Sequence, residues 1–187
     1  MIKAVIFDFF DVFRTDAYKT WLRKNNIAHE GAYFEASRLQ DVGEITTDGF
    51  LAMLSKLQGR TVTFEEVDGS ATVDHEVVEI ADALRKHYRL ALLSNASSAF
   101  LRQLLHELKL DTKFDEIVIS SEVGVAKPSA EIFEITLKKL GVDASEVIFV
   151  DDNERHTQAA EKLGIKSIIF SSASQLKQDL EGLGLKV

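Results

Sequence analysis

Short apolar runs rich in branched side chains recur along the chain and predict buried β-strands. The first run, residues 2–7, stops abruptly at Asp8, as expected for a strand that delivers a carboxylate to its carboxyl end. Four similar runs follow at residues 90–93, 117–119, 147–150 and 167–170. Between them, apolar residues recur with helical spacing around residues 100–108, 132–140 and 159–163. This alternation predicts an α/β fold in which helices cover both faces of a parallel sheet.

The interval between residues 16 and 72 breaks this alternation and predicts a helical insertion after the first strand. Its apolar positions indicate amphipathic helices, and no stretch within it reads as a strand. The expected helices lie around residues 16–25, 30–42, 46–57 and 73–87, the last of which returns to the sheet. We therefore expect a core domain made of residues 1–15 and 73–187, and a smaller helical domain made of residues 16–72.

Composition limits the expected partners and the cellular compartment. Acidic side chains outnumber basic ones by 30 to 22, and no run of Lys or Arg supplies the positive surface that a nucleic acid requires. No apolar stretch is long enough to cross a membrane, and the absence of cysteine suits a reducing compartment. We expect a cytoplasmic protein with no nucleic-acid or membrane partner, and infer no obligate protein partner.

Polar residues gather at the predicted carboxyl ends of the strands, where open parallel sheets bind their ligands. Each group alone is also common as a turn, a loop or a helix cap. Together they place several carboxylates beside a lysine, and a divalent cation among oxygen ligands, typically Mg²⁺, would relieve the repulsion between the carboxylates. The four groups are Asp8 to Asp11, Ser94-Asn95, Lys127-Pro128 and Asp151-Asp152-Asn153.

The chain resembles the haloacid dehalogenase superfamily of hydrolases in the order and spacing of four segments: FDFFDVFRTD, LLSN, GVAKPSAEIF and FVDDNERHTQAAEKLGI. The resemblance covers nearly the whole length. It implies a Rossmann-like parallel sheet with helices on both faces and a small helical cap inserted after the first strand. The segment GEITTDGF in the insertion also resembles the cap of the subgroup that includes small sugar-phosphate phosphatases and the phosphatase domain of epoxide hydrolases.

The resemblance implies a Mg²⁺-dependent phosphatase of a small phosphorylated metabolite and assigns roles to individual residues. Asp8 would be the nucleophile and would form an aspartyl-phosphate intermediate. Lys127 would offset the charge of the nucleophile and the phosphate, while Ser94 and Asn95 would hydrogen-bond the phosphoryl oxygens. Mg²⁺ would be held by Asp8, the backbone carbonyl of Phe10 and Asp152, with Asp151 as a supporting carboxylate.

The chain departs from the family pattern at Phe10, Asp11 and His156. Family phosphatases usually read Asp-x-Asp-Gly, and their second carboxylate protonates the leaving group and then activates water. Phe10 replaces that carboxylate, a change expected to cost ~10²–10⁴-fold in rate unless the leaving group is a good one. Asp11 replaces the glycine and is either a substitute acid or a turn residue. His156 replaces an Asp or Asn and is expected at most to support the metal ligands.

Two alternative functions remain open from the sequence. A metal-independent 2-haloacid dehalogenase also lacks the second carboxylate, but those relatives usually have Ser-Ser-Asn where this chain has Asp151, Asp152 and Asn153. A binding protein on a weakened catalytic core would explain Phe10 but not the retention of Asp8 and Lys127.

Other conspicuous residues lie in the insertion or, in the case of Arg14, at the hinge before it. The aromatic residues Tyr18, Trp21, Tyr33 and Phe34 are expected to pack between helices. Arg14 and Arg38 are expected either at solvated positions or in contact with a substrate anion.

Overall fold

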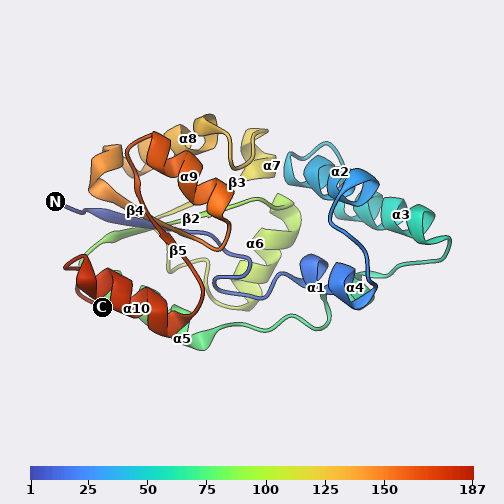
Figure 1. Ribbon diagram of the computed structural model, residues 1–187, viewed down its shortest axis with the longest axis horizontal. Helices are drawn as coiled ribbons and strands as arrows, with labels where there is room; N and C mark the ends of the chain where they lie inside the picture. Colours follow the sequence, from blue (N-terminus) through green and yellow to red (C-terminus); the bar gives the residue numbers. More distant parts are fainter.

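A five-stranded parallel sheet forms the centre of the protein, whose computed structural model describes residues 1–187. The strand order is β3-β2-β1-β4-β5, so β1 lies between β2 and β4 (Figure 1). The predicted α/β fold is confirmed, and the strand bounds differ from the expected ones by at most two residues. The strands are β1 (Ala4–Phe7), β2 (Arg89–Ser94), β3 (Glu116–Ile119), β4 (Val147–Asp151) and β5 (Lys166–Ile169).

Helices cover both faces of the sheet. Alternate side chains of each strand point to opposite faces, and since both sets are apolar, both faces need a covering layer. Val5 and Phe7 of β1 pack with α5 (His75–Leu84), α6 (Ser98–Glu107) and α10 (Ala173–Gly182). Ala4 and Ile6 pack on the opposite face with α8 (Ala130–Leu140) and α9 (Glu154–Lys162). The short helix α7 (Ser120–Val123) follows β3, and a 3₁₀ turn (Ala144–Glu146) precedes β4.

Four helices lie between β1 and α5 and pack around a hydrophobic cluster of their own, which includes Trp21, Phe50 and Leu54. They are α1 (Ala17–Lys24), α2 (Gly31–Asp41), α3 (Thr47–Gln58) and α4 (Phe64–Asp68). Figure 1 shows them grouped at one end of the sheet, with α2 next to α7. The helix expected over residues 73–87 is shorter, and α4 was not predicted.

No helix in the structure combines the length and the apolar character that a membrane span requires.

Candidate active site

The carboxyl ends of three adjacent strands carry buried polar side chains. Asp8 follows β1, Ser94 ends β2, and Asp151 ends β4. Because β1 pairs with both β2 and β4, these three predicted site residues lie at the same edge of the sheet. The Ser94 hydroxyl is buried and has no hydrogen-bond partner in the protein. Since buried polar atoms are nearly always satisfied, this hydroxyl is a candidate to hydrogen-bond a ligand at the strand edge.

Lys127 connects two of these strand ends. Its Nζ lies 2.9 Å from Asp8 Oδ1 and 2.6 Å from Asp151 Oδ2, and all three side chains are buried. Asn95 fixes the lysine backbone, since its Oδ1 accepts from Lys127 N at 2.9 Å and its Nδ2 donates to Lys127 O at 3.0 Å. An amide nitrogen carries two donors, so one N–H of Asn95 remains available to a ligand.

The two oxygens of Asp8 have different surroundings. Oδ1 accepts a hydrogen bond from Phe9 N at 2.7 Å and pairs with Lys127, whereas Oδ2 accepts no hydrogen bond from the protein. The side chain also lines a cavity between the core and the insertion. The nucleophilic role assigned to Asp8 requires such an arrangement, with one oxygen held and the other free to react.

Burial and charge act against each other in this cluster. Burial raises the pKa of Asp8, and the nearby Lys127 opposes that rise. Burial would also raise the pKa of Asp151, but Lys127 and a hydrogen bond from His156 outweigh it and hold this pKa below its usual value. The His156 Nδ1 lies 3.0 Å from Asp151 Oδ1. Asp151 is therefore a permanently ionised partner that keeps Lys127 charged and in place.

Asp152, the predicted direct metal ligand, lies beside an unpredicted cation. Lys19 Nζ, on α1 of the insertion, lies 3.1 Å from Asp152 Oδ2 and 3.0 Å from Asp11 Oδ2. A third carboxylate, Asp16, lies 3.7 Å from the same nitrogen. Lys19 thus joins the loop after β1, the start of α1 and the end of β4.

Asp11 is a turn residue in this structure. Its φ of 57° is in the left-handed region, which glycine adopts readily and which Asp tolerates better than most other residues. Asp11 Oδ1 accepts from Asp16 N at 2.7 Å, and Oδ2 pairs with Lys19. Both oxygens therefore hold the loop, so the structural interpretation of Asp11 fits better than a role as substitute acid.

Phe10 belongs to a row of aromatic rings that runs from the core into the insertion. Its ring stacks on Phe100 with centroids 6.4 Å apart, and Phe100 meets Phe64 of α4 at 5.5 Å. The side chain has no group that exchanges protons. The Phe10 carbonyl accepts no backbone hydrogen bond, and it remains available to a cation.

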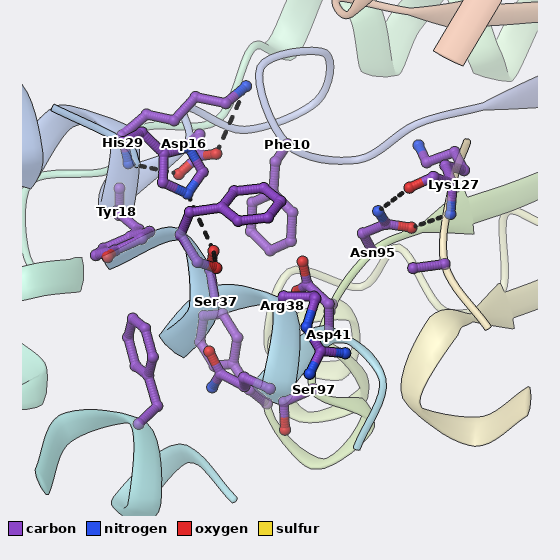
Figure 2. A pocket seen from close by; sticks show the side chains of 18 of the residues that line it. Phe10, Asp16, Tyr18, His29, Ser37, Arg38, Asp41, Asn95, Ser97 and Lys127 are labelled. Atoms are coloured by element: carbon purple, nitrogen blue, oxygen red, sulfur yellow. Dashed lines mark hydrogen bonds and ion pairs between the residues drawn. The ribbon is translucent and has the colours of Figure 1, made fainter. Parts of the chain in front are cut away.

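A cavity of about 310 Å³ lies between the core and the insertion. The core contributes Asp8, Lys127 and Asp152 to its lining. Figure 2 shows the side chains of the insertion around the same space, with Arg38 and Asp41 below Phe10 and with His29 near Tyr18. Apart from Arg38, which was expected either in solvent or in contact with a substrate anion, these insertion residues lay outside the predicted site. They become neighbours of Asp8 only when the insertion folds over the sheet.

Two expectations about the insertion and the hinge before it are wrong. Phe34 does not pack inside but is 47% exposed and lines the cavity. Arg14 is neither solvated nor free for a substrate: it is buried, with two hydrogen bonds of 3.0 and 2.7 Å to Asp68.

The other conspicuous residues lie where they were expected. Trp21 is buried in the hydrophobic cluster of the insertion, and Tyr18 and Tyr33 pack partly against this cluster. Arg38 lines the cavity and pairs with Glu35 and Glu44.

The site provides oxygen atoms of the kind that Mg²⁺ prefers. Carboxylates of Asp8 and Asp152 face the cavity, and the free carbonyl of Phe10 follows Asp8 by two residues. Donor atoms of Asp8, Asp151 and His156 lie within 4.8 Å of one another, although Lys127 already occupies the space beside both carboxylates. Binding through Asp8, Asp152 and the Phe10 carbonyl uses oxygen donors alone, but it brings the ion close to Lys19, whose Nζ lies 3.1 Å from Asp152 Oδ2.

Comparison with known proteins finds related hydrolases both by sequence and by structure. The family model for haloacid dehalogenase-like hydrolases matches residues 2–164. D-ribitol-5-phosphate phosphatase from Bacteroides thetaiotaomicron is 29% identical, over 96% of this chain and 97% of that protein. A haloacid dehalogenase-like hydrolase from Porphyromonas gingivalis matches with a TM-score of 0.76 and 22% identity over 98% of both chains.

A second solved structure is a family enzyme from Bacteroides thetaiotaomicron in complex with magnesium and inorganic phosphate. It matches with a TM-score of 0.72 and 22% identity, over 94% of this chain and 99% of that one. Both structures are 22% identical to this chain, so their likeness establishes that the fold is shared.

Proposed function

We propose that this chain, which belongs to the haloacid dehalogenase-like hydrolases, is a Mg²⁺-dependent phosphatase of a small phosphorylated metabolite. The observation that carries the proposal is the placement of Asp8. One of its oxygens is held by Lys127 and Phe9 N, while the other is unpartnered beside a cavity. A nucleophile that must form and then release an acyl phosphate needs this combination of fixed orientation and free reactivity.

The chain's own residues divide the work of phosphoryl transfer. Asp8 attacks phosphorus, forms an aspartyl-phosphate and releases the alcohol, and water then hydrolyses that intermediate. Lys127 offsets the negative charge that gathers when a phosphate approaches Asp8. The unpartnered hydroxyl of Ser94 and the free N–H of Asn95 donate hydrogen bonds to phosphoryl oxygens. This preorganised charge is the main source of catalysis in phosphoryl transfer.

Mg²⁺ would be held by the carboxylates of Asp8 and Asp152 and by the backbone carbonyl of Phe10, with Asp151 in support. These groups fit the ion because they are oxygen donors that face one cavity. When bound, the ion supplies positive charge to the transferring phosphoryl group. The magnesium and phosphate in the related Bacteroides thetaiotaomicron structure support this assignment.

The substrate class follows from the insertion. We propose that residues 16–72 form a cap that selects the substrate, since they line the side of the cavity opposite Asp8. The size of the cavity suits a short sugar or polyol phosphate. Ser37, Gln40 and Thr47 line it with hydroxyl and amide groups that can hydrogen-bond the hydroxyls of such a substrate. Similarity over nearly the full length to D-ribitol-5-phosphate phosphatase supports a phosphorylated polyol.

The acidic pair at β4 disfavours the dehalogenase alternative. A 2-haloacid is itself a carboxylate, and Asp151 and Asp152 would repel it beside Asp8. A phosphatase instead uses these charges to hold the lysine and the metal ion.

The test is to assay purified protein against sugar, polyol and glycolate phosphates, with Mg²⁺ and with a chelator. We expect release of phosphate that requires Mg²⁺ and is strongest for a polyol or sugar phosphate. Asp8→Asn serves as the matched control, because the amide keeps the shape of the side chain but cannot attack. Release of halide from a 2-chloro acid without metal, and no phosphate release, would establish the dehalogenase instead.

A further inference from the structure

Asp41, the last residue of α2, is the one carboxylate lining the cavity that has no partner in the protein. Asp8 pairs with Lys127, Asp68 with Arg14, and Asp16 and Asp152 with Lys19. The half-buried carboxylate of Asp41 makes no hydrogen bond and no ion pair. Both of its carboxylate oxygens are therefore free to contact a molecule bound in the cavity that Asp8 also lines.

We propose that Asp41 is the general acid and base of this enzyme and performs from the insertion the task that Phe10 cannot perform from the core. The inference rests on the proposed phosphatase function. It assigns the missing proton transfer to a residue on the opposite wall of the cavity.

The position of Asp41 is fixed by contacts with the core. Its backbone carbonyl accepts a hydrogen bond from the buried hydroxyl of Ser120, at the start of α7. Two residues later, Gly43 has a φ of +78°, and a Cβ there would lie 2.9 Å from the Ser121 carbonyl oxygen. The carboxyl end of α2 is therefore packed closely against the core, which gives Asp41 the defined position that proton transfer requires.

The in-line geometry of phosphoryl transfer places the leaving oxygen on the side of phosphorus away from the nucleophile. Asp8 approaches from the sheet, so the leaving oxygen faces the insertion. Figure 2 shows the Asp41 side chain on that wall, directed from α2 toward Phe10. A single residue there serves both steps, because water enters through the space that the alcohol has vacated.

The surroundings of Asp41 suit a group that alternates between protonated and ionised forms. Burial raises its pKa to about 7, the charge of Asp16 adds to the rise, and Lys127 opposes it. Three other groups near α2 carry or can carry charge: Arg38 pairs with Glu35 and Glu44, Glu122 of α7 pairs with Arg102, and His29, whose pKa is lowered by burial, lies 3.0 Å from Ser37 Oγ. Asp48 and Lys56 of α3 do not line the cavity. General acids and bases work best when their pKa lies near the working pH.

The proposed steps balance in atoms and protons. In the first, Asp8 Oδ2 forms a bond to phosphorus, the bond to the leaving oxygen breaks, and protonated Asp41 gives its proton to that oxygen. In the second, ionised Asp41 takes a proton from water, the water oxygen bonds to phosphorus, and the bond to Asp8 breaks. One water is consumed, one alcohol and one phosphate are released, and both aspartates return to their starting states.

The experiment compares the wild type, Asp41→Asn and the control Asp48→Asn on a series of phosphate esters that differ only in leaving-group pKa. We expect Asp41→Asn to lower turnover of alkyl phosphates by ~10²–10³-fold, with a much smaller loss of phosphorylation rate on aryl phosphates. The exposed Asp48 should tolerate the same change. An unchanged dependence on the leaving group in Asp41→Asn would overturn the proposal.

The pH profile provides a second measurement. Because the first step needs protonated Asp41, kcat/KM of the wild type for an alkyl phosphate should fall as the pH rises through about 7, and Asp41→Asn should lack this fall. The proposal is overturned when the variant retains the fall at the same pH. Two failures can be told apart. If the wild type transfers no phosphate from any ester, the proposed function itself fails. If the wild type is active and Asp41→Asn behaves like it, only the role of Asp41 fails.

The melting temperature separates a chemical role from a structural one. A carboxylate whose pKa is raised by folding contributes stability that is lost as the pH rises through its folded-state pKa. Asp41→Asn should therefore melt higher than the wild type at about pH 8, with the difference shrinking toward about pH 4. A variant that melts lower than the wild type across this range, and loses activity in proportion, would show a structural role instead.

Discussion

Phe10 and Asp41 face the same cavity from opposite sides and differ in their chemistry. The Phe10 ring extends the aromatic row through Phe100 to Phe64 and so contributes to the contact between core and insertion. Asp41 brings an unpaired carboxylate to the same cavity from the other side. In our proposal, the proton-transfer group has moved from the loop after β1 to a helix of the insertion.

If this division of roles is right, Phe10→Asp should rescue Asp41→Asn. We expect the double variant to recover at least ~10-fold of the lost alkyl-phosphate turnover, because the restored carboxylate follows Asp8 by two residues, as in relatives. Phe10→Asn in the same background is the control, since it removes the ring and adds no proton donor of suitable pKa. Steady-state turnover on an alkyl phosphate is the measurement. Equal gains from Phe10→Asp with and without Asp41 would show that Asp41 supplies no proton.

For single residues, the sequence predicts which side chains become neighbours when the order of the strands brings them together. Asp8, Ser94 and Asp151 could be grouped because carboxyl ends of parallel strands share an edge. Arg14 could not be placed, because its partner Asp68 lies in a helix too short to show periodicity. Lys19 and Asp41 were missed because their position near Asp152 and Lys127 depends on how the insertion docks.

Among the elements, the carboxyl end of α2 has the most demanding geometry. The helix ends at Asp41, Ser120 binds its last carbonyl, and Gly43 approaches the Ser121 carbonyl closely. The left-handed φ of Gly43 and the lack of space for a side chain both require glycine there.

Gly43→Ala should therefore lower both stability and activity. The left-handed backbone alone costs about 1–2 kcal/mol for a non-glycine residue, and the contact with Ser121 adds to this. The control is Gly59→Ala, because Gly59 has a φ of +64° but a Cβ there would meet no atom within 4 Å. Denaturant unfolding and turnover measure the two effects. Equal stability losses, with full activity in both variants, would show that the position of the α2 end does not matter for the reaction.

The strands could be predicted because their apolar runs are continuous, as expected for strands buried on both faces. The helix α4 could not, since its five residues cover little more than one turn. Its two ends are placed by contacts with distant segments, since Phe64 meets Phe100 and Asp68 binds Arg14.

At the scale of the whole molecule, the core and the insertion are joined by charges as well as by the aromatic row. Arg14 binds Asp68 through two hydrogen bonds, and Lys19 binds both Asp11 and Asp152. Lys19 thus places a positive charge beside the carboxylate that is proposed to hold Mg²⁺. Binding of the ion requires this charge to be moved away or tolerated.

Replacing Lys19 should consequently change the affinity for Mg²⁺. We expect Lys19→Met to bind the ion roughly 3–10-fold more tightly, since removal of a cation near Asp152 removes a repulsion of about 1 kcal/mol in a partly solvated site. Lys24→Met is the matched control, because Lys24 lies on the same helix and its side chain hydrogen-bonds Ser70 and no carboxylate. Calorimetric titration with Mg²⁺ measures both variants. Weaker binding by Lys19→Met than by Lys24→Met would contradict the competition between lysine and metal ion.

The central claim is that Asp8 forms a covalent phosphoenzyme, and the most direct test is to trap it. Protein mixed with an aryl phosphate and Mg²⁺ is quenched in acid, and the peptide that contains Asp8 is examined by mass spectrometry. We predict one added phosphoryl group on Asp8, greater accumulation in Asp41→Asn, and none in Asp8→Asn or after chelation of Mg²⁺. Wild-type turnover by Asp8→Asn, or hydrolysis by the wild type with no phosphate ever found on Asp8, would contradict the mechanism.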